Sequence, residues 1–416
     1  MRSLSARVRI AAWLGLVLLM GACASAPPPP SPPPVVPPVV VVPPTPPPLA
    51  PPPSPMTALR RDGRWLVNGG GTYVWRMATG FALVDLVADG NETAAMLFLD
   101  SLRADGFTGV RVLSTLCCWF RLTSAEGLAA LPRTLALARA RGMYVEVVAL
   151  AATRTAASGG KDWTEAEIRA HVRHVGAICG QAVNCLIELA NENYHASQRA
   201  TLLTDVTFLR SLRASIPPHV LVSFGAGPSD EKDNYPGGDY VTVHSGRGRS
   251  TWDDVRHARE QETISVKCRC FVVDNEPLGA GEENTGSRSV NPHEFFARGA
   301  LSRLLGTGST FHFQNGLRAV PPAGHQFDAA RAYIAGTRLV PDPVRLAFRN
   351  AGWTGVLESP VKSFSGAVRV YSGISPQTNL AMALGVTPAF RMQLRTGWRA
   401  EMIMDRPNVQ VFRLWQ

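Results

Sequence analysis

Eight short apolar runs alternate with helix-like segments through the middle of the chain. The first run, with its loop, spans residues 73–86, and the others span 110–113, 144–150, 186–190, 220–224, 240–244, 271–274 and 309–314. Helix boundaries between them are marked by signals such as the capping-box pattern Thr164-x-x-Glu167 and the stop at Asp105-Gly106. Buried strands that alternate with helices predict a parallel sheet, so eight repeats predict an α/β fold, a (β/α)8 TIM barrel over residues 56–339.

The pattern changes after about residue 340. Short alternating runs at 367–371, 380–384, 390–394 and 409–414 are separated by Gly, Pro and Asn turns. This pattern predicts a small C-terminal antiparallel β-sandwich domain over residues 340–416. We expect it to cover apolar barrel surface, because no motif assigns it a separate binding role.

The start of the chain predicts an exported protein. A basic segment precedes the apolar stretch 10–20, which is too short to span a bilayer, and Met20-Gly21-Ala22-Cys23 resembles a bacterial lipobox. We expect a signal peptide at 1–22, acylation of Cys23 and an outer-membrane lipoprotein on the periplasmic or surface face of the cell envelope. Because Met20 stands where a lipobox usually has Leu, plain cleavage and secretion stay open.

Residues 23–55 form a predicted linker. From residue 26 the segment is almost entirely Pro, with Val, Ser and Ala, and such a composition favours extended polyproline over a packed core. We therefore expect a stalk between the membrane and the barrel.

The cysteines suit an oxidising compartment. Besides Cys23, the chain has six: Cys117, Cys118, Cys179, Cys185, Cys268 and Cys270. Cys179 and Cys185 flank a short turn and could bridge, whereas Cys-Cys at 117 and Cys-x-Cys at 268 are awkward for local bridges. The pairing stays open, with buried thiols as the alternative. Neither a Cys-x-x-Cys pair nor a His cluster has zinc spacing, so we expect no metal and no cofactor.

Two of the predicted strands end in the same dipeptide, Asn191-Glu192 after the fourth strand and Asn275-Glu276 after the seventh. The carboxyl ends of barrel strands carry the chemistry, and these two strands face each other across the mouth. One Glu after a strand is often a solvated loop residue, but a repeated motif favours catalysis. Two carboxyls about 5–5.5 Å apart would suit retaining hydrolysis of a glycosidic bond.

The order and spacing of these motifs resemble the retaining (β/α)8 glycoside hydrolases of the clan that includes cellulases and mannanases. The segment 102–111, LRADGFTGVR, is similar to that clan's entry into strand two. The resemblance spans about residues 65–339. It implies a poly- or oligosaccharide substrate cleaved at β-glycosidic bonds by double displacement.

The resemblance also implies individual roles. Glu192 matches the acid/base and Glu276 the nucleophile. Asn191 matches the neighbour that binds the sugar 2-hydroxyl, Arg111 the arginine that supports the nucleophile, and His244 an active-site histidine. From the residues alone, Arg111 could equally be an ordinary ion-pair residue and His244 a core histidine.

Further candidates are aromatic. Trp119, Tyr194 and Trp252 follow strands at the same face and could stack on sugar rings. Where the clan usually has Trp at the end of strand eight, this chain has His312-Phe313-Gln314, so His312 or Phe313 could form part of that platform.

Two alternatives stay open. Gly246 stands where the clan often has Tyr, and the strand-eight Trp is missing, which favours a catalytically inactive glycan-binding surface lipoprotein with the same fold. A phosphate-binding barrel enzyme is disfavoured, because Glu282 and Glu283 follow the glycines after strand seven. The formal net charge of +10 suits acidic glycans or an anionic envelope. Basic runs with interleaved aromatics are absent, so we expect no nucleic-acid partner.

Overall fold

The computed structural model describes residues 56–114, 120–154, 161–225, 227–228, 237–244, 261–277, 279–281, 288–339, 347–350, 360–367, 369–374, 379–406 and 409–416. The predicted signal peptide, linker and Cys23 lie outside these ranges, as do Cys117, Cys118, Trp119, Gly246 and Trp252. Within the described ranges, no helix is both long and apolar enough to cross a bilayer.

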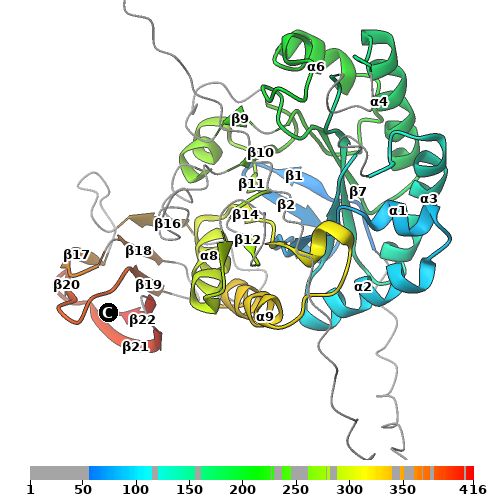
Figure 1. The fold of residues 1–416 in the computed structure, drawn as a ribbon. Helices are drawn as coiled ribbons and strands as arrows, with labels where there is room; N and C mark the ends of the chain where they lie inside the picture. Colours follow the sequence, from blue (N-terminus) through cyan, green and yellow to red (C-terminus); the bar gives the residue numbers. More distant parts are fainter. Residues whose placement is uncertain are drawn as a thin grey trace, which may run out of the picture. The chain divides into compact units, whose positions relative to one another are not determined.

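Parallel strands close a barrel (Figure 1). In chain order they are β4 (Met77–Thr79), β5 (Gly109–Val112), β6 (Tyr144–Leu150), β7 (Cys185–Ala190), β8 (Val222–Ser223), β10 (Val241–His244), β11 (Val272–Asp274) and β14 (Gly308–Ser309). Continuous parallel ladders join β4 through β8 and β10 through β14, and a bridge from Ala78 to Phe311 joins the last strand to the first. The seam between β8 and β10 uses side chains, since the Thr242 amide donates to the Ser223 hydroxyl over 3.1 Å. The predicted (β/α)8 barrel is confirmed.

Helices separate the strands. They are α1 (Leu83–Ala88), α2 (Glu92–Asp105), α3 (Ala125–Arg139), α4 (Glu165–Gly180), α5 (Ala200–Leu203), α6 (Val206–Arg213), α8 (Pro292–Leu305), the 3-10 turn η1 (Asn315–Arg318) and α9 (His325–Thr337). Both predicted signals hold. Thr164 and Glu167 form the capping box that opens α4, and α2 ends at Gly106, whose φ of 104° favours glycine.

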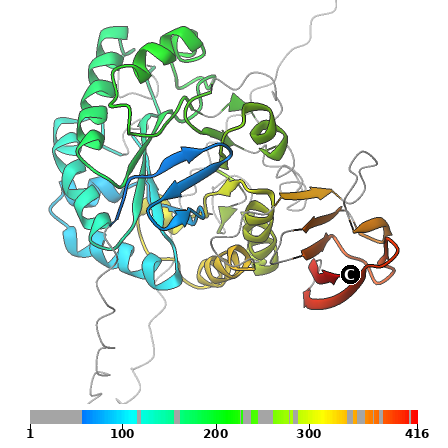
Figure 2. The same ribbon diagram turned by 180° about the vertical axis from the view of Figure 1, so that it is seen from behind.

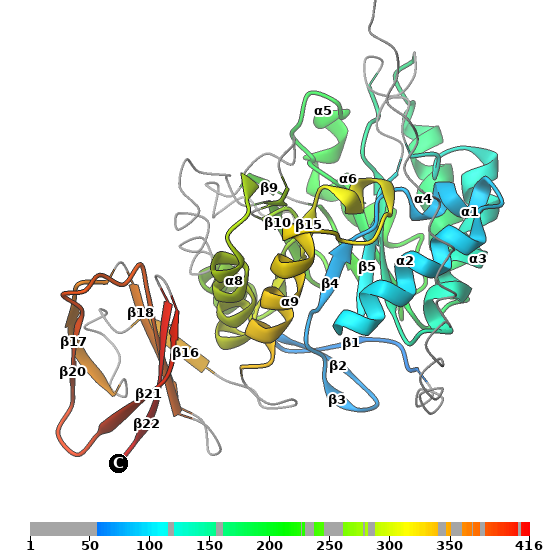
Figure 3. The ribbon, with the colours of Figure 1, turned by 60° about the horizontal axis from the view of Figure 1, so that its bottom comes forward.

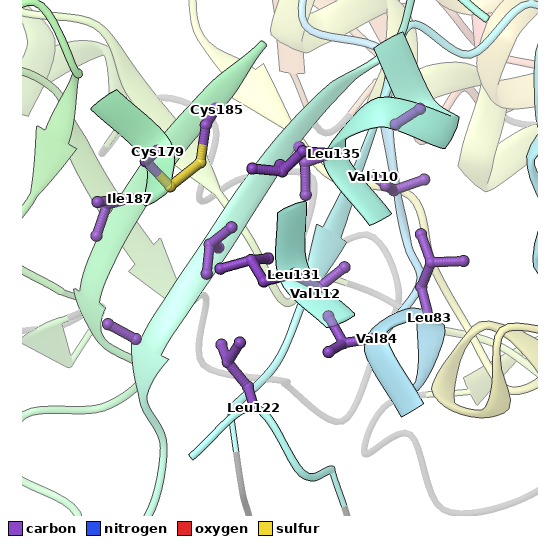
Figure 4. Packing of buried hydrophobic residues seen from close by; sticks show 14 of the residues in the cluster. Leu83, Val84, Val110, Val112, Leu122, Leu131, Leu135, Cys179, Cys185 and Ile187 are labelled. Carbon is purple, nitrogen blue, oxygen red and sulfur yellow. A yellow bond between two sulfur atoms is a disulfide. The ribbon is translucent and has the colours of Figure 1, made fainter. Parts of the chain in front are cut away.

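The main apolar cluster lies between the strands and these helices (Figure 4). The Cys179–Cys185 disulfide lies in this cluster and ties the end of α4 to the start of β7, a pairing that the sequence had left open. Cys268 and Cys270 also form a disulfide, contrary to expectation. Arg269 between them adopts a left-handed conformation with φ of 49°, and this turn lets the two side chains meet.

An antiparallel sheet covers the amino end of the barrel and was not predicted. It comprises β1 (Arg60–Asp62), β2 (Trp65–Asn68) and β3 (Gly71–Thr72). Leu66 packs there against residues at the starts of the barrel strands, among them Tyr144, Leu186 and Phe271. Figures 2 and 3 show this blue sheet across the end opposite to that where β7 and β10 finish. It closes the amino end, so the carboxyl end holds the candidate site.

Short strands line the carboxyl end. Strands β12 (Gly279–Ala280), β13 (Arg288–Ser289) and β15 (His312–Phe313) pair in parallel, and β9 (Gly227–Pro228) pairs with β10.

The C-terminal strands form two antiparallel sheets. The larger contains β16 (Ala347–Asn350), β18 (Arg369–Ile374), β19 (Asn379–Leu384), β22 (Val409–Trp415) and β21 (Arg399–Arg406), and the smaller pairs β17 (Val361–Ser365) with β20 (Arg391–Leu394). Alternation along β19 explains the packing. Leu380, Met382 and Leu384 face α8, whereas Ala381 and Ala383 face the cluster shared with β17 and β20. Strand β19 is therefore buried on both faces. Because residues 340–346 are outside the described ranges, the 339/340 domain boundary stays a prediction.

Candidate active site

The polar residues singled out in the sequence converge at the carboxyl ends of the barrel strands. Arg111 lies on β5, Asn191 and Glu192 follow β7, His244 ends β10, and Glu276 follows β11. The strands run parallel, so their carboxyl ends all open at one face and residues far apart in sequence meet there.

Glu192 and Glu276 face each other with His244 between them. One nitrogen of His244 and one carboxylate oxygen from each glutamate all lie within 4.8 Å of one another. Nδ1 of His244 is 3.1 Å from Oε1 of Glu192 and 3.8 Å from Oε2 of Glu276. This separation of two carboxylate oxygens lies near the roughly 5–5.5 Å between the carboxyls of retaining glycosidases and below the about 6.5–9.5 Å of inverting ones.

Arg111 donates a hydrogen bond to Glu276 from within the barrel. It is fully buried, and its Nη1 donates to Glu276 Oε1 over 3.0 Å. Nη2 donates to Asn191 Oδ1 over 2.7 Å and to Glu188 Oε2 over 2.9 Å, and Nε also donates to Glu188. Burial acts to lower the Arg111 pKa, but the carboxylates around it outweigh burial and raise it. This guanidinium is a permanent positive charge beside Glu276.

A second layer of hydrogen bonds fixes Glu188. Thr242 Oγ1 donates to Glu188 Oε1 over 3.0 Å, and Asn275 Nδ2 donates to Oε2 over 3.1 Å. Asn275 in turn accepts a hydrogen bond from Thr310, which is bonded to the Trp75 indole. Sequence analysis gave no role to Asn275. Its position beside Glu276 in the repeated dipeptide was the available signal.

Glu192 and His244 form a hydrogen-bonded pair, and each shifts the pKa of the other. Burial acts to raise the pKa of Glu192, but the hydrogen bond and charge of His244 lower it overall. Burial acts to lower the pKa of His244, but the charges of Glu276 and Glu192 and the Glu192 hydrogen bond raise it. These opposite shifts come from one contact, in which Nδ1 of His244 lies 3.1 Å from Oε1 of Glu192.

The remaining predicted candidates lie in different environments. His312 is buried, with Nδ1 2.8 Å from the Thr79 hydroxyl and its ring 5.8 Å from that of Phe81. Phe313 is fully buried in the main apolar cluster and stacks on Phe311, so it offers no face to a sugar here. Its backbone pairs with β12, and this pairing points the ring into the core. Tyr194 is exposed at the rim.

Sequence reasoning missed one aromatic neighbour. The ring of Phe81 lies 5.5 Å from the Arg111 guanidinium and packs edge-on against Phe120. A cation over an aromatic face is favourable, so Phe81 helps to fix Arg111. Its place just after the first predicted strand was the only sequence signal.

Two carboxylates and an imidazole are also a donor set that divalent metals accept. Here Arg111 already neutralises Glu276, and Nδ1 of His244 is engaged with Glu192. These contacts fit a proton-transfer site better than a metal cage.

Neither a protein-family model nor a curated protein matches the sequence. Solved structures do match in fold. A glycoside hydrolase family 5 protein from Bacteroides vulgatus ATCC 8482 superposes with a TM-score of 0.58 at 14% identity, over 86% of this chain and 93% of that one. Another structure, described as a glycoside hydrolase, has a TM-score of 0.58 at 12% identity, over 86% and 96% of the two chains. At such identities the similarity establishes the fold. Over most of its length, the chain therefore has the fold of these glycoside hydrolases, one of which belongs to family 5.

Proposed function

We propose that this protein is a retaining glycoside hydrolase that cleaves β-glycosidic bonds of a poly- or oligosaccharide. The observation that carries the proposal is the close approach of Glu192 and Glu276. His244 is hydrogen-bonded to Glu192, and Arg111 donates to Glu276. The fold alone would not suffice, since one barrel fold hosts many activities.

In the first step Glu276 attacks the anomeric carbon and forms a glycosyl ester. Arg111 keeps this carboxylate ionised and oriented. Glu192 protonates the leaving oxygen, using the proton that it shares with His244, and the bond to the aglycone breaks. We assign contact with the sugar 2-hydroxyl to Asn191, and its hydrogen bond from Arg111 supports this role by fixing the side chain.

In the second step Glu192 takes a proton from water, the water attacks the anomeric carbon, and Glu276 leaves as a carboxylate. The charge of Glu276 raises the Glu192 pKa, so forming the ester removes that influence and favours ionised Glu192 when a base is needed. Arg111 stabilises the departing carboxylate.

Two variants of the full chain and one covalent inhibitor test this assignment. Glu276→Gln should lower turnover by more than about 10³-fold with the circular dichroism spectrum retained. Glu192→Ala should cost about 10²–10⁴-fold on unactivated substrates, and much less on dinitrophenyl glycosides, with partial rescue by azide. A 2-fluoro glycoside of the accepted sugar should label Glu276, as seen by peptide mass spectrometry. The matched control is Glu126→Gln on the exposed first turn of α3. Labelling elsewhere, or full activity of Glu276→Gln, would refute the assignment.

A second candidate function is glycan binding without turnover by a surface lipoprotein. It is favoured by the lack of Trp at the end of strand eight and by Gly246. Saturable binding of an oligosaccharide in calorimetry, together with no hydrolysis across a panel of aryl glycosides and polysaccharides, would favour this reading.

We also propose that the protein is exported and anchored to the cell envelope through acylated Cys23, with residues 23–55 as the stalk. Cys23→Ser should abolish fatty-acid labelling and release the protein from membranes. Equal membrane association of wild type and variant, without label in either, would rule the anchor out.

A further inference from the structure

A third carboxyl, Glu146, is buried beneath the candidate site. It lies in the middle of β6, is fully buried, and stands directly across the ladder from Arg111 on β5. Its Oε2 is 3.7 Å from Nε of Arg111, and its Oε1 is 2.7 Å from the hydroxyl of Tyr240, just before β10. Glu146 does not reach the cleft and has no part in the proposed reaction.

The charges around Arg111 do not balance if every carboxyl is ionised. Glu146, Glu188 and Glu276 all lie within 4 Å of this one guanidinium. Glu276 must be ionised to act as a nucleophile, and Glu188 accepts hydrogen bonds from Arg111, Thr242 and Asn275 on its two oxygens. Three buried carboxylates against one guanidinium leave excess negative charge, which is costly to bury. Glu276 and Glu188 are the two whose ionised forms are accounted for, so a proton that reduces this excess belongs on Glu146.

Hydrogen-bond counting at Tyr240 leads to the same result. The Tyr240 hydroxyl lies 2.7 Å from Glu146 Oε1 and 3.2 Å from the backbone oxygen of Ile187. A phenol has one proton and cannot donate to both. If Glu146 is protonated, its O–H donates to the Tyr240 oxygen, and Tyr240 donates to Ile187. Only this arrangement gives each of these contacts a proton.

We propose that Glu146 is a positioning residue, held as a neutral carboxylic acid, that keeps Arg111 on Glu276 and whose ionisation at higher pH loosens that contact. The role rests on the proposed hydrolase function, because the contact with Glu276 matters only if Glu276 reacts. When Glu146 loses its proton to solvent, its new charge competes with Glu276 for the guanidinium. The glycosyl ester then loses part of the stabilisation of its departing carboxylate.

The electrostatics support this geometry. Burial and then the charge of Glu188 raise the Glu146 pKa to about 7, against the opposing effect of Arg111. The titratable groups that face Glu146 are Arg111 from β5, Glu188 from β7 and Tyr240 from the segment before β10. The change of charge therefore falls near neutral pH.

The first test needs no activity. Glu146→Gln mimics the neutral acid, since its amide can donate to Tyr240. A folded-state pKa raised above the usual value stabilises the protein fully below the unfolded pKa, and this contribution is lost as pH rises through the folded pKa. The wild-type melting temperature should therefore fall between pH 4.5 and 7.5 relative to that of Glu146→Gln, whereas Glu126→Gln should track wild type.

Infrared spectroscopy supplies a readout that requires no activity, and its pH titration is measured on the wild type itself. A carboxylic-acid carbonyl band should be present at pH 6, disappear on titration through pH 7–8, and be missing from Glu146→Gln. Tyr240→Phe should shift the band and lower the melting temperature most at acidic pH, because it removes the acceptor for the acid proton. No acid band at pH 6, or a band unchanged in Glu146→Gln, would overturn the proposal.

The second test uses an activated dinitrophenyl glycoside, for which loss of Glu276 from the ester limits the rate. This step needs Glu192 as a base, so it should not fail at high pH for lack of a general acid. Wild-type kcat should drop several-fold above pH 7, and kcat of Glu146→Gln should stay level. Profiles of the same shape in both proteins would leave Glu146 with a structural role only. If no glycoside is cleaved, the proposed function fails, and the infrared and melting tests still decide the charge state of Glu146.

Discussion

At the scale of single residues, one arginine organises the candidate site. Arg111 donates to Glu276, Glu188 and Asn191, and a guanidinium is the side chain whose fork can serve several planar acceptors at once. The environments of the two glutamates differ, since Glu276 faces Arg111 and Glu192 faces His244, and we propose that this difference sets their roles. Two identical side chains can thus take opposite roles.

The pH dependence should follow the proton shared by His244 and Glu192. Because the His244 pKa is raised, wild type should keep this proton above the usual histidine value, and activity on unactivated substrates should fall only as pH rises past it. In His244→Gln the proton rests on a carboxyl alone, so the basic limb of kcat/KM should move to lower pH. Profiles of both proteins check this. An unmoved basic limb would show that His244 does not hold the catalytic proton.

At the scale of elements, the carboxyl ends of the barrel strands hold the candidate site, and a disulfide braces the start of one of these strands. Glu192 follows the carboxyl end of β7, whereas Cys185 at its amino end is bridged to Cys179 on α4. The bridge lies inside the main apolar cluster, one strand length away from the glutamates.

Removing this bridge should therefore weaken the fold and spare the chemistry. For a sequence separation of 6 residues, loop entropy gives a loss of about 2 kcal/mol in the free energy of unfolding. Urea denaturation of the double variant Cys179→Ala/Cys185→Ala measures the loss, and its kcat should stay within about twofold of wild type. An unchanged unfolding midpoint would mean that the bridge does not form in the folded protein.

At the scale of the whole molecule, the C-terminal sheet is part of the barrel's packing. Leu380, Met382 and Leu384 of β19 and Val409 and Val411 of β22 cover apolar residues of α8, among them Phe296 and Leu304. Each buried aliphatic side chain contributes about 1.5–3 kcal/mol, so this contact contributes strongly to stability.

A chain that ends at Leu339 should consequently lose several kcal/mol of stability and aggregate, because α8 would present its apolar face to water. Thermal melting and light scattering measure this. Met382→Ser, which alters the face toward α8, should lower the melting temperature. Arg391→Ser, on the exposed side of β20, should not. A soluble truncated barrel with an unchanged melting temperature would contradict the packing role.

Much of this protein could be predicted from local patterns. Strand and helix periods depend on near neighbours in sequence, so the eight repeats and the antiparallel C-terminal strands were predictable. The direction shared by parallel strands then placed Glu192, His244 and Glu276 at one face, and the structure brings these side chains together. Their chemical roles stay proposals.

Tertiary structure alone decided the rest. The contact of Glu146 with Arg111 and Tyr240, and the burial of Phe313, depend on which strands become neighbours when the barrel closes. The Cys268–Cys270 bridge depends on a left-handed turn at Arg269, a conformation that sequence does not favour for arginine. Residue type and spacing state what a side chain can do, but the ionisation and the reach of a buried group are set by neighbours that arrive from distant parts of the chain.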